Sequence, residues 1–231
     1  MKARDVMTSP PITVTPDTAI TDVATLLLER RISAVPVVDE HGRMVGIVSE
    51  GDLLRRSESD TERRRPQWLE LLLDPNIQAA DFVKTHGTHA GDVMTRDVVA
   101  VSPDTDLAEI ASLLEQRRIK RVPVVENGIP VGIVSRANLL YGLVAYKKAP
   151  SGLQAASDPE IQQRVTESLR AEPWIDLSRL NIVVSDGVVH LWGLVKSEEQ
   201  RRALKVAAGA VPGVRSVEDH LGLDRFPNFS G

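Results

Sequence analysis

The chain has 231 residues, of which 42% are hydrophobic, 3% are aromatic and none is cysteine, and its formal net charge at pH 7 is −4. This length predicts one to two domains with cores of Val, Ile, Leu and Ala, and the lack of cysteine excludes disulfides, thiol nucleophiles and thiolate metal sites. The negative charge argues against a broad nucleic-acid surface. Because the sequence lacks a signal-peptide pattern and an apolar run of about 18 residues, we expect a soluble, cytoplasmic protein with no nucleic-acid partner.

One segment occurs twice in the chain. The frame RRI··VPVV occupies residues 30–38 and 117–125, and Ser33-Ala34 of the first copy become Lys120-Arg121 in the second. Three shorter motifs recur in the same order: DVMT at 5–8 and 92–95, TPDT or SPDT at 15–18 and 102–105, and GIVS at 46–49 and 132–135. A repeat of this length indicates one structural unit used twice.

Each copy predicts the same series of elements. In the first copy, TPDT marks a helix start with a Thr or Asp cap, and apolar residues follow at helical spacing, at positions 20, 23, 24, 27 and 28. AVPVV and MVGIVS predict two strands around a turn, and a short helix is expected at 51–56. The second copy has its apolar face at 107, 110, 111 and 114 and its short helix at 137–143. Each copy is expected to have the order strand, helix, strand, strand, helix. A unit of about 50 residues has only a marginal core, so the two copies should pack together.

The rest of the chain predicts a connector and a third small domain. Residues 57–89 begin as an exposed, charged connector, with helices expected near 66–73 and 79–85. After a linker at 145–157, the sequence DPE at 158–160 marks the start of a helix. The segment NIVVSDGVVHLWGLV predicts a hairpin around Asp186-Gly187, followed by a helix capped by Ser197 and a half-buried strand at 214–221. The expected order is αββαβ.

The repeated motifs resemble those of the CBS domain, and the chain is similar to a tandem CBS pair (a Bateman module) at residues 3–56 and 90–144. The segment at 158–223, which contains VHLWGLV, resembles a BON domain, and residues 224–231 form a tail. The fold class is therefore expected to be α+β (mixed α/β): two βαββα CBS units packed by a pseudo-twofold, plus a small αββαβ BON domain. By the same resemblance, we expect a homodimer whose CBS units bind AMP, ADP, ATP or S-adenosylmethionine, and a BON domain that binds phospholipid or an unknown protein.

The resemblance also assigns binding residues. The family's ribose ligand is the last residue of the motif GhhS/T-x-x-D, which is Asp52 in the first copy and Asn138 in the second. The family's phosphate ligands include a basic pair before VPVV, and only the second copy has it, as Lys120 and Arg121. The two differences are complementary, so we expect one complete cleft that uses Asp52 with Lys120 and Arg121.

Further residues complete this assignment. Ser49 and Ser135 would add hydroxyl contacts to the phosphates and Arg136 a charge, while Thr13 and Val14 would line the adenine side. The opposite cleft, with Asn138 and Ser33, is expected to be weak or empty. No cofactor is required, and the phosphate residues favour a nucleotide over S-adenosylmethionine.

Structural explanations compete with these assignments. Cations at 117–121 are favourable at a helix C-terminus, and Asp52 can cap the short helix that follows its strand. The expected function is a non-catalytic regulatory or sensor module with the BON domain as its output. The alternative is a ligand-free dimeric scaffold that presents BON domains to membranes or partners.

Other groups point away from catalysis and metal chemistry. His86 and His89 have the spacing of a metal pair but lack a third ligand nearby, so we expect no metal site. The chain has neither a nucleophile elbow nor a Walker-type loop, so we expect no enzyme. His190 and Trp192 share one face of a strand and are expected in a core rather than at a lipid surface. The cations Lys196, Arg201, Arg202 and Lys205 are diluted by Glu198 and Glu199.

Overall fold

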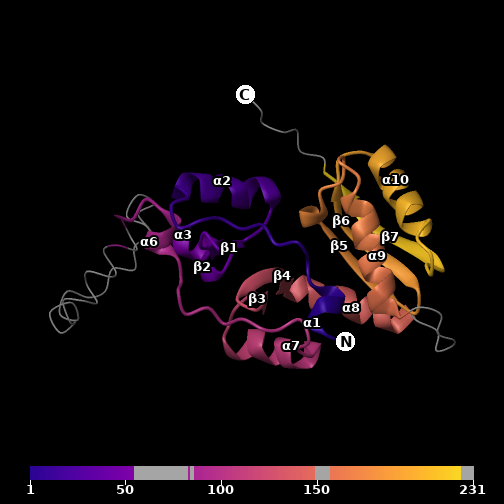
Figure 1. Ribbon diagram of the computed structural model, residues 1–231, viewed down its shortest axis with the longest axis horizontal. Helices are drawn as coiled ribbons and strands as arrows, with labels where there is room; N and C mark the ends of the chain where they lie inside the picture. Colours follow the sequence, from indigo (N-terminus) through magenta and orange to yellow (C-terminus); the bar gives the residue numbers. More distant parts are fainter. Residues whose placement is uncertain (55–82, 84–85, 149–156, 225–231) are drawn as a thin grey trace. The chain divides into compact units, whose positions relative to one another are not determined.

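The computed structural model describes residues 1–54, 83, 86–148 and 157–224, which form two compact units (Figure 1). The smaller unit comprises Pro11–Ala100 and Val125–Pro130, and the larger comprises Met1–Pro10, Val101–Val124 and Val131–Gly231. The helices expected at 66–73 and 79–85, and most of the linker, lie outside the described residues. Within the described ranges, no helix is long and apolar enough to cross a membrane.

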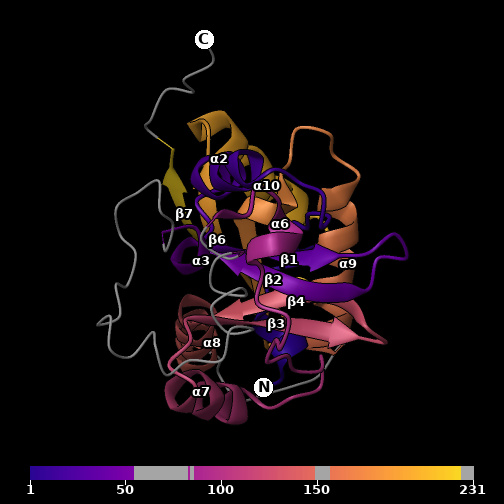
Figure 2. The same cartoon turned by 90° about the vertical axis from the view of Figure 1, so that its left-hand side faces the viewer.

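The smaller unit is built on the first copy of the repeat. Its elements are α2 (Ile20–Arg30), β1 (Ala34–Val38), β2 (Met44–Ser49), α3 (Glu50–Leu54) and α6 (Ala90–Val93). Strands β1 and β2 are antiparallel, with Ala34 opposite Ser49 (Figure 2). The expected opening strand is reduced to a single parallel bridge between Val14 and Val37. Alternate β-branched residues of both strands face the helices and form the core.

The larger unit contains the second copy of the repeat apart from residues 90–100 and the turn at Val125–Pro130. Its elements here are α1 (Ala3–Val6), α7 (Leu107–Gln116), β3 (Arg121–Glu126), β4 (Ile129–Ser135) and α8 (Arg136–Lys148). Strands β3 and β4 pair as β1 and β2 do, and Val101 makes the bridge to Val124 that Val14 makes in the first copy. The predicted repeat of elements is therefore confirmed, with each first strand shortened to a bridge. The helix expected at 137–143 is longer than predicted, because α8 continues to Lys148 and so includes the start of the expected linker.

The expected helix caps are wrong in both copies. Helix α2 begins after Ala19 and α7 after Asp106, and neither residue makes a side-chain cap. The hydroxyl of Thr18 instead accepts a hydrogen bond from the backbone N–H of Thr15 at 3.1 Å, and Thr105 does the same for Ser102. The TPDT motif thus folds into a turn before the helix. The apolar face is also narrower than expected, because Leu28 is 79% exposed.

Each DVMT motif packs on the opposite copy of the repeat, which the sequence does not predict. Helix α1 of the first copy donates from Ala3 N–H to Thr105 O at 2.8 Å, and Thr8 exchanges backbone hydrogen bonds with Ile133 of the second copy. In the smaller unit, α6 of the second copy makes the corresponding bond from Ala90 to Thr18 O at 2.8 Å. Each unit therefore completes its core with a motif from the other copy.

The C-terminal part of the larger unit has the expected αββαβ order. Its elements are α9 (Asp158–Arg170), a 3₁₀ turn η2 (Leu177–Arg179), β5 (Leu180–Ser185), β6 (Val188–Val195), α10 (Glu198–Gly209) and β7 (Ser216–Leu223). Strand β6 lies in the middle of the sheet, antiparallel to β5 and parallel to β7. One sheet face packs with α9 and α10 around a core that includes Ile161, Leu169 and Leu191. Ser157 caps α9, while Asp158 accepts the backbone N–H groups of the hairpin turn at Asp186 and Gly187, both at 2.8 Å.

The backbone carbonyl of Val6 ties the C-terminal domain to the second copy. It accepts hydrogen bonds from the side-chain amides of Asn138 on α8, at 2.8 Å, and Asn181 on β5, at 2.7 Å. Both asparagines are buried, at 3% and 5% exposure. Gln162 of α9 adds a hydrogen bond to Asp5 O at 3.1 Å. The short helix α1 is thus the shared support of α8 and the C-terminal sheet.

We predict that Asn138→Asp lowers the free energy of unfolding by about 1–3 kcal/mol. The substitution removes the donor to Val6 O and to Thr8 Oγ1, which lies 3.2 Å away, and buries a carboxylate in its place. The measurement is thermal or urea unfolding. The reverse exchange at the equivalent position, Asp52→Asn, is the control and should change stability little. Equal stability of wild type and Asn138→Asp would contradict the role of this amide.

Candidate functional site

Asp52 lies in the first turn of α3 and is partly exposed. Its Oδ2 accepts hydrogen bonds from the backbone N–H of Ser49 at 2.9 Å and from the Ser49 hydroxyl at 2.6 Å. The residue therefore has the capping role proposed as its structural explanation. Its second carboxylate oxygen makes no hydrogen bond to any residue within the described ranges, so it remains able to accept from a ligand hydroxyl.

Ser33, Thr13 and Val14 lie in the same unit as Asp52. Ser33 O accepts the backbone N–H of Glu50 at 3.0 Å, which brings the start of β1 beside the start of α3. Val14 is buried and Thr13 is exposed. The geometry therefore groups the ends of β1 and β2 with α3, and it brings Ser33 beside the helix of Asp52, whereas the sequence analysis assigned Ser33 to the opposite cleft with Asn138.

The predicted phosphate residues form a basic group in the larger unit. Lys120 and Arg136 are exposed and Arg121 is partly exposed. The backbone N–H of Arg136 donates to Lys120 O at 3.3 Å, which joins the start of β3 to the start of α8. Ser135, the residue before α8, is adjacent to Arg136. Four of the predicted phosphate ligands are therefore close together, and two of their side chains are open to solvent.

Asn138 is fully engaged in structural contacts. Its Oδ1 accepts from the backbone N–H and the hydroxyl of Ser135, at 2.8 and 2.5 Å, and its Nδ2 donates to Val6 and Thr8. Both amide donors are used, so in this arrangement none is left for a ribose. Position 138 therefore requires Asn rather than Asp for a structural reason. The amide both accepts from Ser135 and donates to α1, whereas an ionised carboxylate can only accept.

Two open pockets each lie within one unit. One, of about 450 Å³, is lined by Pro16, Asp17, Val45, His89, Gly91, Asp92, Met94 and Arg96. The other, of about 360 Å³, is lined by Arg164, Glu167, Ser168, Ala210, Val211 and Pro212. Neither pocket includes a residue predicted to bind the nucleotide. In the first pocket, Asp92 has a structural role, because its carboxylate caps α6 by accepting the N–H groups of Thr88 and His89 at 3.1 Å.

The second face of the C-terminal sheet carries His190 and Trp192, and it is covered as expected for a core. Trp192 stacks on Tyr141 of α8, with ring centroids 4.5 Å apart, and on His220 of β7, at 3.8 Å. His190 is 1% exposed. The alternation of the predicted strand places Glu218 and His220 on one face, but the sequence does not predict the contact of His220 with Trp192, and Tyr141 is not among the predicted site residues. This ring stack is a second connection between α8 and the C-terminal sheet.

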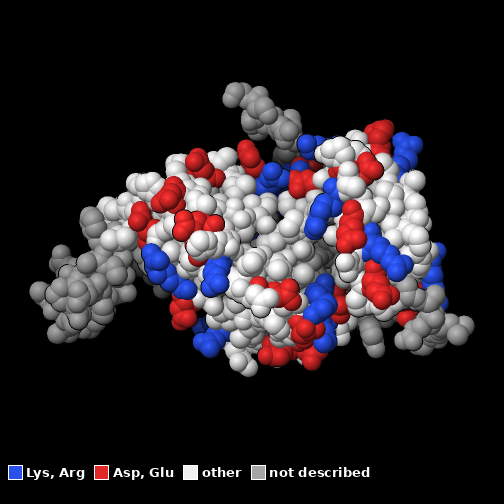
Figure 3. All heavy atoms as spheres, viewed as in Figure 1, with Lys and Arg blue, Asp and Glu red and all other residues white. Residues whose placement is uncertain are grey.

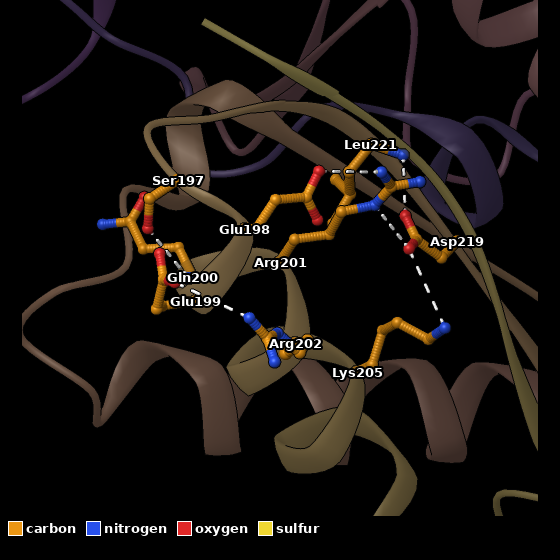
Figure 4. A network of polar contacts seen from close by, with 9 residues as sticks. All are labelled: Ser197, Glu198, Glu199, Gln200, Arg201, Arg202, Lys205, Asp219 and Leu221. Carbon is orange, nitrogen blue, oxygen red and sulfur yellow. Dashed lines mark hydrogen bonds and ion pairs between the residues drawn. The ribbon is translucent and has the colours of Figure 1, made fainter.

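The cations of α10 are paired with carboxylates (Figure 4). Arg201 Nε donates to Asp219 Oδ2 at 2.7 Å and Lys205 lies 3.9 Å from the same oxygen, while Arg202 lies 3.6 Å from Glu199. On the face drawn in Figure 3, acidic and basic side chains are interspersed in each unit. The pairing reduces the positive field that an anionic lipid would require.

The surroundings of Asp219 on β7 shift the pKa of its carboxyl. Burial alone would raise the pKa of its carboxyl, but the hydrogen bonds from Leu221 N–H and Arg201, together with the charges of Arg201 and Lys205, outweigh it and lower the pKa below its usual value. The same hydrogen bond and charge raise the pKa of Arg201.

Comparisons with known proteins agree with the resemblance in both parts of the chain. The CBS domain family matches residues 3–59 and 90–145, and the BON domain family matches residues 157–224. Protein MJ1426 of Methanocaldococcus jannaschii is 33% identical over 155 residues, which cover 62% of this chain and 92% of that protein. The chloroplastic CBS domain-containing protein CBSX2 of Arabidopsis thaliana is 30% identical over 58% of this chain and 59% of its own length. A crystal structure of CBSX2 in complex with AMP superposes with a TM-score of 0.55 and 30% identity, covering 64% of this chain and 99% of that one.

We predict that Asp219→Asn lowers the free energy of unfolding at pH 7 by about 1–3 kcal/mol, because it weakens charge-assisted hydrogen bonds to a side chain that is 9% exposed. Since folding lowers the pKa of Asp219, its contribution is complete above the unfolded value of about 3.9 and is lost as the pH falls through the folded value. The difference between variant and wild type should therefore shrink below about pH 4. Unfolding curves between pH 7 and pH 2 measure it. Glu199→Gln, at an exposed pair, is the control with little effect, and a difference that does not depend on pH would contradict the linkage.

Proposed function

Because the chain belongs to the CBS-domain family and carries a CBS pair followed by a BON domain, we propose that it is a regulatory module whose CBS pair binds an adenine nucleotide. The observation that carries this proposal is the similarity to CBSX2, a relative of 30% identity with a crystal structure in complex with AMP. The module acts by binding rather than by turnover, and no cofactor is required.

The local geometry supports specific ligand contacts. Asp52 holds one carboxylate oxygen in its cap and keeps the other available, so it is our candidate for the ribose hydroxyls. Lys120, Arg121 and Arg136 are the candidates for the phosphate. Lys120 and Arg136 are exposed and Arg121 is partly exposed, so binding an anion costs these cations little desolvation. The absence of an equivalent basic pair at Ser33-Ala34 favours one strong site in each chain. These cations also favour a phosphorylated ligand over S-adenosylmethionine.

Helix α8 is our candidate for the route from ligand to output. It begins at Arg136, a proposed phosphate residue, and carries Asn138, which holds α1, and Tyr141, which stacks on Trp192 of the BON domain. A ligand that prefers one position of α8 biases these contacts by about 1.4 kcal/mol for each tenfold difference in its affinity for the two states. Because the α10 cations are paired, we propose a protein rather than an anionic lipid as the BON partner.

Exposed leucines support a homodimer formed through the CBS helices. Leu54 on α3 and Leu140 on α8 occupy the same position in the two copies, and both are 61% exposed. Leu143, one turn beyond Leu140, is 53% exposed. Burial of these leucines against a second copy of the chain would remove their apolar surface from water and so stabilise a dimer.

We predict that AMP raises the midpoint of thermal unfolding and that Asp52→Asn abolishes this shift. At 100 times its dissociation constant the ligand should contribute about 2.7 kcal/mol. Asn at position 52 can still accept from Ser49, as Asn138 does from Ser135, so the ligand-free midpoint should be unchanged. Lys120→Ala with Arg121→Ala should weaken AMP and ATP more than S-adenosylmethionine.

The matched control is Arg117→Ala, which removes an exposed cation at the end of α7. It should leave the AMP shift intact. If no adenosine compound moves the midpoint and the purified protein carries none, the nucleotide function is wrong, and the ligand-free scaffold takes its place.

We further predict that Leu54→Glu combined with Leu140→Glu converts the dimer to a monomer. Both positions are exposed, so the folded chain should tolerate the charges, whereas a dimer interface would have to bury them unpaired. Sedimentation measures the change. Leu28→Glu, at an exposed leucine of α2, is the control that should remain dimeric. A double variant that stays dimeric would place the interface elsewhere.

A further inference from the structure

Three potential metal ligands converge on the second face of the BON sheet. His190 Nδ1 lies 3.4 Å from His220 Nε2 and 3.6 Å from Glu218 Oε2, and His220 Nε2 lies 3.5 Å from the same carboxylate oxygen. The three atoms form a nearly equilateral triangle. Within the part of the chain that the structure describes, this is the one group of three or more His and carboxylate side chains with such convergent ligand atoms.

The triangle has the dimensions of a coordination site. A tetrahedral Zn²⁺ with ligands at about 2.0–2.1 Å has ligand–ligand distances of about 3.3–3.4 Å. The observed sides are within a few tenths of an ångström of this value, and the two distances to the carboxylate are longer than the roughly 2.7–3.2 Å of an N–H···O hydrogen bond. In the ion-free structure the two imidazoles, whose planes lie 5° apart, share a hydrogen bond between His190 Nδ1 and His220 Nε2, which a bound cation would replace.

The sheet register fixes this arrangement. Strands β6 and β7 are parallel, with His190 opposite Glu218 and Trp192 opposite His220, so all four side chains project from one face. The His220 ring is held by stacking on Trp192, and Trp192 in turn by Tyr141. His190 is 1% exposed. Ligands that are already oriented by packing lose little freedom when an ion binds.

We propose that His190, Glu218 and His220 bind a divalent transition-metal ion, with Zn²⁺ as the reference ion. Two imidazoles and one carboxylate are borderline ligands that suit Zn²⁺ and its neighbours rather than Mg²⁺ or Ca²⁺. Because the side chains of Glu218 and His220 are 32% and 20% exposed, the site opens to solvent on their side, and water or a partner's side chain takes the fourth position. The site is independent of the nucleotide site and lies next to the rings through which α8 contacts the BON domain.

The test uses the full chain without an affinity tag, freed of metal by a chelator and titrated with Zn²⁺ by calorimetry. We expect one ion per chain, together with a visible absorption band of tetrahedral type when Co²⁺ is added instead. His220→Phe keeps a ring for the stack but removes the nitrogen, and Glu218→Gln keeps the shape but removes the charge. Each substitution should lower the affinity for Zn²⁺ by more than the roughly 10–100-fold loss that follows when a residue that only supports a metal ligand is changed.

The controls are His41→Ala and His86→Ala, which remove exposed histidines of the smaller unit. Both should bind Zn²⁺ as the wild type does. The proposal is overturned if the wild type binds no stoichiometric Zn²⁺, or if His220→Phe and Glu218→Gln bind it unchanged. If His220→Phe does not fold, Glu218→Gln decides alone, because its carboxylate lies at the solvent side of the site.

Discussion

The backbone carbonyl of Val6 is the acceptor on which the organisation of the larger unit depends. One oxygen receives buried amides from the CBS helix α8 and from the BON strand β5. Buried polar groups are costly unless paired, so the two donors and this acceptor specify a single relative position of α1, α8 and the sheet. The BON domain is therefore held against the second CBS copy through a helix of four residues from the far end of the sequence.

Much of the fold follows from the sequence because the motifs carry local physical information. The alternation in VHLWGLV and the Asp186-Gly187 turn determine a hairpin whatever surrounds them. The helix caps were not predictable, because Thr18 and Thr105 satisfy nearby backbone groups in a turn instead. The exchange of the DVMT motifs was also not predictable, since the two motifs have the same sequence and only tertiary packing determines which copy each one contacts.

The sequence also predicts only part of the candidate sites. Family motifs identify Asp52 and the basic pair, and the structure adds that Asp52 also caps a helix and that Asn138 is fully occupied. The sequence alone does not reveal the role of Asn138, because that role depends on the Val6 carbonyl of α1 lying beside the side-chain amide. The convergence of His190 with Glu218 and His220 depends on the register between β6 and β7, which strands separated by a helix do not reveal. Spacing along one segment, as at His86 and His89, is the weaker guide to ligand geometry.

The exchanged DVMT motifs have a consequence for the ancestry of the chain. A protein with one copy of the repeat could complete its core only by lending its motif to a second molecule and receiving one in return. Duplication and fusion of such a gene would enclose both exchanges in a single polypeptide, which is the arrangement seen in the pairs Ala3–Thr105 and Ala90–Thr18. In a single polypeptide the two copies can differ in sequence, as they do at Asp52 and Asn138 and at Ser33-Ala34 and Lys120-Arg121.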